Sequence, residues 1–273
     1  MHPKPTHLEG LRVVELAGVL AGPAVGMFFA ELGAEVIKVE NKRSGGDVTR
    51  TWKTPAENPA DKDSAYYHAV NWGKQIELRD LNDSADLDVV LKMISSADIL
   101  LVNFKAGDAE RYGLDVSTLR NRFPQLIIGQ ITGFSDESRV AFDAVLQAES
   151  GLMSLNGARE QGPLKLPVAF IDLFAAHQLK EGLLLALLKR SKSGEGAHVK
   201  VSLFDSAISS LANQASVYLN TGIASGRTGS LHPSIAPYGE TFACADGHYI
   251  LIACGSDAQF LALCTTLNRT ALN

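Results

Sequence analysis

Cysteine is scarce in this 273-residue chain, and its three copies stand ten residues apart, at Cys244, Cys254 and Cys264. An odd number without a closely spaced pair predicts neither a disulfide framework nor a zinc site, and it fits a reducing cytoplasm. Basic residues are also in the minority, with 25 Lys and Arg against 30 Asp and Glu and a net charge of -5. This balance argues against non-specific binding to nucleic acid.

Long apolar runs and repeats are missing as well. Residues 1–9 contain no apolar core of a signal peptide, and Gly, Pro or charged residues break every apolar run before the roughly 20 residues that a membrane helix needs. The composition, 46% hydrophobic and 20% charged, is typical of a globular chain with one large domain or two small ones. We therefore expect no membrane span, no nucleic-acid partner and no bound metal.

The stretch 163–190 holds the most informative pattern. An apolar run leads to one acid, Asp172, and apolar residues then cover most of the circumference of a predicted helix over 173–190. A helix that is apolar on nearly all sides lies in a core. Asp172 stands where an N-cap would, at the positive end of the helix dipole. Two interpretations stay open at this point: a cap alone, or a nucleophile or acid/base group on a rigid scaffold.

Apolar strands alternate with helices through most of the chain. The predicted strands are 11–16, 35–40, 75–78, 99–102, 126–131 and 199–203, and the predicted helices are 24–32, 83–97, 114–122, 142–155, 173–190 and 204–219. Strands that are apolar on both faces and alternate with helices predict an α/β fold, in which helices cover both sides of an open parallel sheet. The polar stretch 41–74 is long enough that we expect a functional loop, and the alternative is a solvated excursion.

A linker is predicted at 221–230, because this stretch is rich in Gly, Ser and Thr. The predicted domains are thus 1–220 and 231–273. The second opens with a hairpin whose turn is Asp246-Gly247 and continues into a helix over 258–267. One hairpin and one helix are too little for an independent domain, so we expect the start of a smaller α+β domain.

An NAD site is one interpretation of the first strand–helix–strand unit. Glu40 lies 22 residues after Gly18, where a ribose-binding acid would stand. However, Gly18, Gly22 and Gly26 are four residues apart, and the dinucleotide pattern is G-x-G-x-x-G. The spacing therefore argues against NAD. Polar residues such as Asn103 and Thr132 follow the predicted strands, at the edge where open α/β sheets bind ligands.

Motifs spread along the chain resemble CoA-transferase family III, a group that includes formyl-CoA transferase, carnitine CoA-transferase and α-methylacyl-CoA racemase. The matching segments occur in the family's order, and they are 8–15, 21–23, 32–40, 46–50, 147–153, 189–190, 194–196, 237–239 and 246–247. The resemblance implies a Rossmann-like sheet and a cytoplasmic, homodimeric enzyme whose two chains interlock. Family members run on beyond the point that matches Asn273, so the small domain is expected to be incomplete relative to the family.

The resemblance also gives Asp172 a role, as the family's catalytic aspartate. It implies transfer of CoA from an acyl-CoA thioester to a carboxylic acid, through an aspartyl anhydride and an aspartyl-CoA thioester. The chemistry of the residue agrees, because a carboxylate with a reference pKa of about 3.9 is ionised at neutral pH and needs no partner base. What it needs is a dry pocket and a site that stabilises the oxyanion.

Further site residues follow from the same resemblance. It places CoA against Val19, Ala21, Lys38, Lys74, Asn103, Phe104 and Arg111, and the substrate against Phe142, Asp143 and Gln147. Cationic side chains suit phosphates, and Phe104 suits the adenine or the pantetheine arm. The alternative for each cation by itself is a solvated surface charge.

Two other functions stay open beside transfer. Racemases of the family carry a His before the acid that matches Asp143, and Phe142 occupies that place here. Racemisation needs an acid and a base on either side of the α-carbon, so the missing His disfavours an α-methylacyl-CoA racemase-like isomerase. The third alternative is a CoA-binding relative that has lost catalysis.

Overall fold

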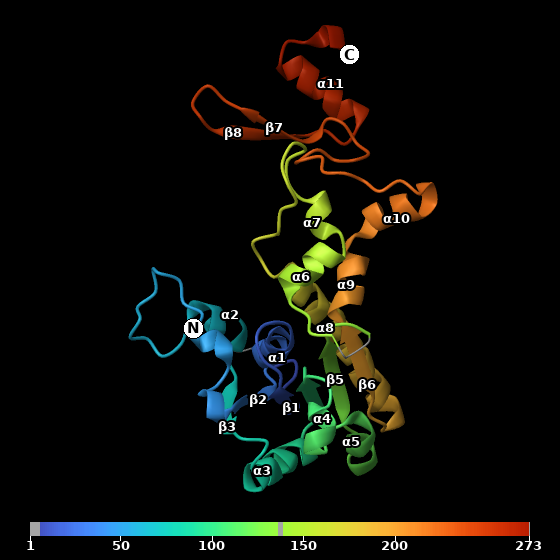
Figure 1. The fold of residues 1–273 in the computed structure, drawn as a ribbon. Coiled ribbons are helices and arrows are strands. Elements are labelled where there is room, and N and C mark those ends of the chain that lie inside the picture. The colour runs from blue at the N-terminus through green and yellow to red at the C-terminus, as the bar shows by residue number, and fades with distance from the viewer. Residues whose placement is uncertain (1–5, 136–138, 273) are drawn as a thin grey trace. The chain divides into compact units, whose positions relative to one another are not determined.

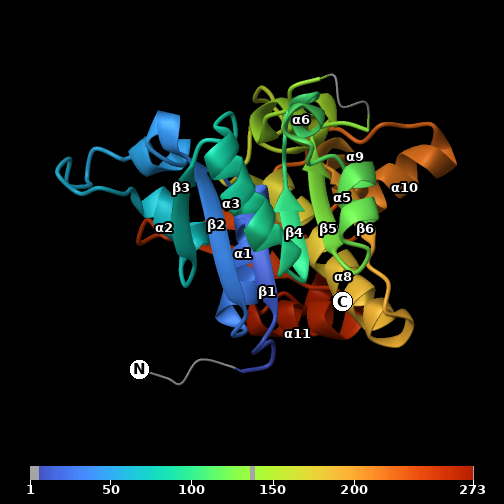
Figure 2. The same cartoon turned by 90° about the horizontal axis from the view of Figure 1, so that it is seen from below.

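Six strands form one sheet in the order β3-β2-β1-β4-β5-β6 (Figure 1, Figure 2). In the computed structural model, which describes residues 6–135 and 139–272, all neighbouring strands of this sheet are parallel. They are β1 (Arg12–Leu16), β2 (Glu35–Asn41), β3 (Gln75–Arg79), β4 (Ile99–Val102), β5 (Ile127–Thr132) and β6 (His198–Ser202). This is the strand order of the Rossmann-like open sheet, and the predicted fold class is confirmed.

Helices cover both faces of this sheet, which explains why its strands are apolar throughout (Figure 2). On one face, α1 (Ala21–Glu31) and α8 (Phe170–Ser193) pack against each other and against the strands. On the other face, Val90 and Ile94 of α3 (Ser84–Ser95) and Leu119 of α5 (Val116–Arg122) join a core cluster with strand residues. Every residue of β4 is buried between the two layers.

The chain divides into two compact units, Met1–Leu146 with Ala169–Ser210, and Gln147–Val168 with Leu211–Asn273. The first holds the sheet. The second holds α7 (Leu152–Leu155), α10 (Ala212–Thr221), α11 (Asp257–Thr266) and an antiparallel hairpin of β7 (Tyr238–Ala243) and β8 (Tyr249–Ala253). The predicted hairpin is present, with its turn at Asp246-Gly247 as expected.

Several helices differ from the prediction. The stretch 41–74 contains two short 3-10 helices, Lys42–Ser44 and Val48–Thr51, and the helix α2 (Ala65–Asn71), which Ser64 caps. The helix α4 (Asp108–Tyr112) was not predicted either. Such short helices are formed by local caps and not by a long apolar period, so the periodicity did not reveal them.

Two predicted long helices are each broken in the structure. The stretch 142–155 forms α6 (Asp143–Glu149) and α7, because Gly151 between them has a φ of 85°. The stretch 204–219 forms α9 (Leu203–Ser210) and α10, with Ala212 at a φ of 46° at the break. The second unit therefore includes α10 and 147–168, which lie within the first domain of the prediction.

Helix α8 begins earlier than predicted, and its cap is a different residue. The helix starts at Phe170, so Asp172 lies inside the first turn and its side chain makes no capping bond. Instead, Asp143 Oδ2 accepts hydrogen bonds from the backbone N–H groups of Ile171 at 2.8 Å and Asp172 at 3.4 Å. The prediction that Asp172 is the N-cap is wrong, because the capping carboxylate comes from α6.

The other end of α8 agrees with the prediction. Gly194 is the C-cap with a φ of 72°, and Arg190 and Lys192 occupy the last turn. At 24 residues, α8 exceeds the roughly 20 residues of a membrane span, but it carries polar and charged residues throughout. None of the helices in the described parts of the chain is both long and apolar enough to cross a membrane. The cytoplasmic location stays a prediction.

Candidate active site

The turn from β1 into α1 is held by side chains from other elements. Lys38 of β2 donates from Nζ to the carbonyl oxygen of Ala17 at 2.7 Å. Asn103, which follows β4, accepts from the N–H of Gly18 at 3.1 Å and donates to the Gly18 carbonyl oxygen at 3.0 Å. The first two residues of the turn are therefore fixed from β2 and from the end of β4, the two strands that flank β1.

The third residue of this turn, Val19, has an unusual backbone conformation. Its φ is 72°, in the left-handed region, where a β-branched residue is a rare outlier. A residue in such a conformation costs about 1–3 kcal/mol and persists only where its surroundings hold it. Here Asp47 Oδ2 accepts the Val19 N–H at 3.1 Å, and the other oxygen of Asp47 accepts from the backbone and the hydroxyl of Thr49. Asp47 thus ties the strained turn to the loop after β2.

Four charged side chains form a buried ion cluster beneath the turn, which we call the Lys38 cluster: Glu15, Lys38, Asp47 and Lys74. Lys38 Nζ lies 2.9 Å from Glu15 and 3.1 Å from Asp47, and Lys74 Nζ lies 2.8 Å from Glu15. No side chain of the cluster is more than 2% exposed. Glu15 and Lys38 face each other in the β1–β2 register, which is why they meet.

The ion pairs keep the centre of the Lys38 cluster charged. Burial by itself would lower the pKa of Lys38, but Glu15 and Asp47 outweigh burial and raise it. Burial likewise opposes ionisation of Asp47, yet Lys38 and the bonds from Thr49 hold its pKa below the usual value. For Lys74 burial prevails and lowers the pKa to about 8, although Glu15 opposes it.

The four-residue glycine spacing has a packing reason. A Cβ on Gly26 would lie 1.8 Å from Glu15 Oε2, and a Cβ on Gly22 would lie 2.3 Å from the Cβ of Ala17. Helix α1 therefore approaches β1 so closely that only glycine fits, and the Glu15 carboxylate occupies the space that a side chain at 26 would need. The glycines serve helix–strand packing here.

The acid that could have bound an NAD ribose is engaged within the protein. Glu40 accepts from Arg50 Nε at 2.8 Å, from the Tyr67 hydroxyl at 2.7 Å and from the Asp47 N–H at 2.9 Å. Burial opposes ionisation of Glu40, but the bonds from Arg50 and Tyr67 keep its pKa below the usual value. Arg50 also lies over the Tyr67 ring, 3.8 Å from its centroid, and pairs with Asp63. These contacts anchor the 42–64 loop to β2.

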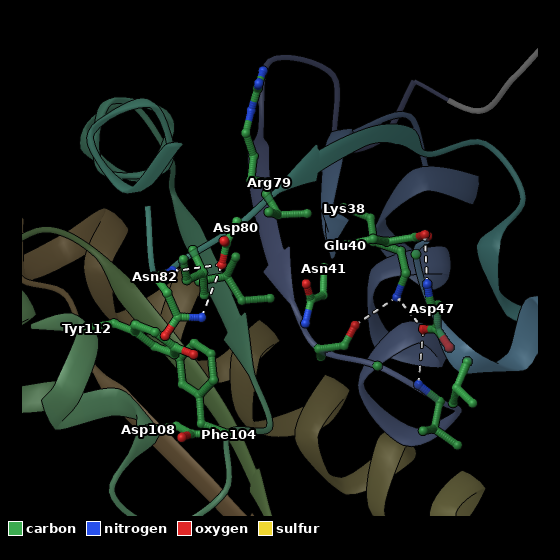
Figure 3. A pocket seen from close by; sticks show the side chains of 18 residues that line it. Lys38, Glu40, Asn41, Asp47, Arg79, Asp80, Asn82, Phe104, Asp108 and Tyr112 are labelled. Carbon is green, nitrogen blue, oxygen red and sulfur yellow. Dashed lines mark hydrogen bonds and ion pairs between the residues drawn. The ribbon is translucent and has the colours of Figure 1, made fainter. Parts of the chain in front are cut away.

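A pocket of about 270 Å³ opens above the Lys38 cluster, where β1, β2 and β3 end (Figure 3). Its lining residues are Leu16, Ala17, Gly18, Val19, Lys38, Val39, Glu40, Asn41, Gly46, Asp47, Val48, Arg79, Asp80, Leu81, Asn82, Phe104, Asp108 and Tyr112. Phe104 and Tyr112 form an aromatic side of the pocket, with ring centroids 6.1 Å apart. This is the edge of an open α/β sheet at which ligands bind.

Three of the seven predicted CoA contacts line this pocket: Val19, Lys38 and Phe104. The other four lie outside the lining. Asn103 braces the turn, Ala21 is buried in the first turn of α1, Lys74 belongs to the Lys38 cluster, and Arg111 is exposed and paired with Asp108 at 3.1 Å. The structure thus brings three of the seven predicted CoA contacts together at the pocket.

The two predicted lysines have fully buried ammonium groups with protein partners. Their contact with phosphates stays a prediction, and the burial favours a role in the scaffold. Two arginines that the sequence analysis missed are closer to what a phosphate needs. Arg79 lines the pocket at the end of β3 and pairs with Glu77 at 2.6 Å and Asp86 at 3.5 Å. Arg43, with a side chain that is 67% exposed, pairs with Asp80 of the pocket wall. Their position just after β2 and at the end of β3 was the available signal.

Asp172 and Asp143 form a pair of carboxylates at the start of α8. Burial first, and then the negative charge of Asp143, raise the pKa of Asp172 to about 7. The expectation that the Asp172 carboxylate is fully ionised at neutral pH is therefore wrong, because a group with this pKa is present in both its neutral and its ionised form near pH 7. Within residues 6–135 and 139–272, no group of three or more His, Cys, Asp or Glu side chains could hold a metal ion.

Tyr66 links the acid pair to the pocket. Burial raises the pKa of its phenol, and the carboxylates of Asp172, Asp143 and Asp47 raise it further, in that order. The Tyr66 pKa therefore depends on the charges of both the acid pair and Asp47, a residue of the pocket wall. The Tyr66 ring also packs edge-on against Trp52, with centroids 5.1 Å apart. Tyr66 of the stretch 41–74 is thus close enough to Asp172 to feel its charge, and a functional role for this stretch stays a prediction.

The other predicted substrate residues have different surroundings. Phe142, directly before α6, is 67% exposed. Gln147 belongs to the second unit, where its Oε1 accepts the Leu166 N–H at 2.9 Å and its Nε2 donates to the Val168 carbonyl at 3.4 Å. Gln147 thereby fixes the segment that precedes α8. The contact of Phe142, Asp143 and Gln147 with a substrate stays a prediction.

Comparison with known proteins decides the family. The model of CoA-transferase family III matches residues 8–273. The chain belongs to CoA-transferase family III. It is therefore an enzyme of that family, and the resemblance recognised in the sequence motifs is confirmed.

Relatives in this family match the chain over nearly its whole length. It is 40% identical to the succinate–glutarate CoA-transferase of Agrobacterium fabrum, over 97% of this chain and 67% of the relative. It is 35% identical to a succinyl-CoA:mesaconate CoA-transferase of Haloarcula hispanica, over 97% and 68%. A crystal structure of a CaiB/BaiF family protein from Brucella suis is 41% identical and superposes with a TM-score of 0.86, over 98% of this chain and 71% of that one. The chain thus spans about two thirds of the length of these relatives.

Proposed function

We propose that the chain transfers CoA from an acyl-CoA thioester to a carboxylic acid, with Asp172 as the nucleophile. An oxygen of the Asp172 carboxylate attacks the thioester carbon, the C–S bond breaks, and an acyl-aspartyl anhydride and CoA thiolate form. The thiolate then attacks the aspartyl carbonyl of the anhydride. That step releases the donor acid as a carboxylate and leaves an aspartyl-CoA thioester.

The second half of the reaction repeats these steps in reverse order. The acceptor carboxylate attacks the aspartyl-CoA thioester, which expels CoA thiolate and forms a second anhydride. The thiolate attacks the acceptor carbonyl of this anhydride, so the new acyl-CoA leaves and the Asp172 carboxylate is restored. Each carboxylate that is released balances one that was consumed, and the cycle needs no outside base.

The state of Asp172 is the observation that carries this proposal. A carboxylate freed from water is a better nucleophile, and burial together with Asp143 raises the pKa of Asp172 to about 7. Perturbed acids of this kind are enriched at functional sites. The position inside the first turn of α8 adds a positive helix end, which stabilises negative charge that develops on the attacked carbonyl.

We infer that the pocket above the Lys38 cluster binds the nucleotide part of CoA. Phe104 and Tyr112 offer aromatic surfaces against which an adenine stacks. Arg43 offers a largely exposed guanidinium group that matches phosphate oxygens, whereas Arg79 would have to exchange its pairs with Glu77 and Asp86 to do the same.

Short dicarboxylic acids are the substrates that we propose to test first. The relatives described above are named for succinate and glutarate in one case, and for succinyl-CoA and mesaconate in the other. We therefore propose succinyl-CoA as the donor, with glutarate and mesaconate as acceptors. A panel of monocarboxylic acids measured beside them would reveal a preference for a second carboxylate.

Trapping of the activated aspartate tests the mechanism. Incubation with succinyl-CoA and hydroxylamine should convert Asp172 into its hydroxamate, which peptide mass spectrometry detects, and Asp172→Asn should remain unmodified. An isomerase would leave Asp172 unmodified while exchanging the α-proton of a branched acyl-CoA in deuterated water. A relative without catalysis would bind CoA and do neither. Unmodified Asp172 in a protein that turns over would exclude the anhydride mechanism.

We also propose that the chain forms a homodimer. In the second unit, the hairpin and α11 expose large apolar side chains, including Phe242, Tyr249, Leu251 and Leu261. Exposed apolar patches of this kind mark interfaces. Sedimentation should give a dimer at micromolar concentration, and charged substitutions at Tyr249 and Leu251 should shift it to monomer. A monomeric wild-type protein would refute the proposal.

A further inference from the structure

The turn that lines the pocket is held more firmly than a connecting turn requires. Three consecutive residues, 17 to 19, are each bonded by one side chain, from Lys38, Asn103 and Asp47 in turn. These side chains come from β2, from the residue after β4 and from the loop after β2. A turn that served connection alone would need none of them, so the arrangement indicates that its shape has a purpose.

The bonds also determine which groups the turn offers to a ligand. The N–H groups of Gly18 and Val19 already donate to Asn103 and Asp47. They are therefore not available as an anion-binding nest, although a glycine turn before a helix is a common phosphate site. What the turn presents to the pocket is the Val19 side chain and backbone surface, placed by the left-handed conformation of Val19.

The Lys38 cluster is better explained by the fixed positions that it gives its side chains than by a gain in folding stability. A buried ion pair gains attraction but loses hydration, so replacing it with apolar groups is often neutral or even stabilising. What such a cluster does provide is fixed geometry. Asp47 uses both carboxylate oxygens, one for Val19 N–H and Lys38 and the other for Thr49, so it cannot shift without breaking several bonds.

We propose that Asp47, held by Lys38, is a positioning residue for acyl-CoA: it keeps Val19 in the left-handed conformation that shapes the nucleotide pocket. This inference rests on the proposed function, because it assumes that the pocket binds CoA. Without Asp47 the turn relaxes towards ordinary φ values, and only a fraction of the molecules present the binding-competent pocket. The apparent dissociation constant rises by the inverse of that fraction.

A double-mutant cycle between positions 19 and 47 tests this dependence. The dissociation constant of CoA is measured by calorimetry for the wild type, Asp47→Ala, Val19→Gly and the double variant. Asp47→Ala alone should weaken CoA about ten-fold or more. Glycine adopts a positive φ without strain, so in the Val19→Gly background the same change should weaken CoA less than about three-fold.

The cycle isolates the coupling even if the Val19 side chain itself touches CoA. Such a contact would lower affinity in both proteins that carry Val19→Gly, and it cancels in the comparison. Effects that simply multiply would overturn the proposal, because Asp47 would then act independently of the Val19 conformation. If Asp47→Ala does not fold, Asp47→Ser replaces it, because the shorter serine side chain does not reach the Val19 N–H but keeps a polar group at this position. The same difference between the wild-type and Val19→Gly backgrounds is expected.

Asp98→Ala is the matched control. Like Asp47, Asp98 pairs with a cationic side chain and accepts a backbone N–H; its partners are Arg190, at 2.8 Å, and the Arg12 N–H. It lies before β4, at the other end of the strands. This variant should lower the melting temperature and leave the CoA dissociation constant unchanged. An equal loss of CoA affinity in Asp98→Ala would show that general destabilisation explains the effect and would overturn the proposal. A wild type that does not bind CoA would instead refute the proposed function.

Discussion

Buried charged groups have opposite surroundings at two places in the first unit. In the Lys38 cluster, acids alternate with lysines, and the pairing raises the pKa of Lys38 and lowers that of Asp47 against the effect of burial. At the start of α8, burial and a second carboxylate act together and raise the pKa of Asp172 to about 7. Burial with opposite charges thus yields a fixed scaffold, whereas burial beside a like charge yields a group that ionises near neutral pH.

Removal of the Asp172 carboxylate should have the largest effect. We expect Asp172→Asn to lower kcat for CoA transfer by about 10³-fold or more, because the variant has no nucleophile. The CoA dissociation constant should stay within a few-fold of the wild type, since CoA nucleotide contacts are expected at the pocket. Steady-state kinetics and calorimetry measure the two quantities. The control is Asp205→Asn, an exposed acid in the first turn of α9, which should keep full activity.

One added methyl group at position 26 should disrupt the packing of α1 against the Lys38 cluster. Gly26→Ala would put a Cβ 1.8 Å from Glu15 Oε2, so the Lys38 cluster or α1 must move. Overpacking of this kind costs about 1–3 kcal/mol of unfolding free energy, or more where the neighbours cannot yield. Denaturant titration measures the loss. Gly162→Ala, where a Cβ meets nothing within 4 Å, should be nearly neutral, and an equal loss there would contradict the packing argument.

The pH dependence of catalysis tests the raised pKa of Asp172. The nucleophile must be ionised, so kcat/KM for the acyl-CoA donor should fall as the pH drops through the Asp172 pKa of about 7. At pH 6 the wild type should retain about a tenth of its plateau value, as a single ionisation requires. Asp143→Asn removes the negative neighbour and should move this acid limb to lower pH. An unmoved limb would mean that Asp143 does not act on Asp172.

Much of the first unit could be predicted from sequence. The apolar strands and their alternation with helices gave all six strands of the sheet, because burial between two layers leaves a clear pattern in each strand. The short helices α2 and α4 were not predicted, because they arise from local caps and lack a long apolar period. The cap on α8 escaped for another reason: Asp143 lies 28 residues before Ile171, and no local pattern joins them.

The site was predictable only in part. The apolar pattern of the helix whose first turn contains Asp172 drew attention to this residue, and the resemblance pointed to Val19 and Phe104, which line the pocket. A signal for the Lys38 cluster was present but unused: Glu15 and Lys38 are charged residues inside apolar strands, and neighbouring parallel strands bring them into register. The φ of Val19 could not be foreseen, since nothing in a valine predicts the left-handed region and its cause, Asp47, is 28 residues away.

The smallest expected effect is on stability, and its sign follows from the raised pKa. An unfolded Asp titrates near about 3.9 and native Asp172 near about 7, so between these values the native state holds the extra proton. Stability from this group is therefore full below the unfolded value, falls as the pH rises through the window, and stays lost above it. Asp172→Asn never ionises and avoids that loss.

Its melting temperature should accordingly match or trail the wild type at pH 4 and exceed it at pH 8, by about 2–4 °C for each kcal/mol recovered. Asp80→Asn provides a control of opposite sign, because hydrogen bonds, from the Asn82 N–H first, lower the pKa of Asp80. That variant should lose stability relative to the wild type above pH 4. If the difference in melting temperature between Asp172→Asn and the wild type does not grow with pH, Asp172 is ionised in the native state well below neutral pH. Its pKa would then not be raised, and Asp172 would resemble the ionised acids of the Lys38 cluster.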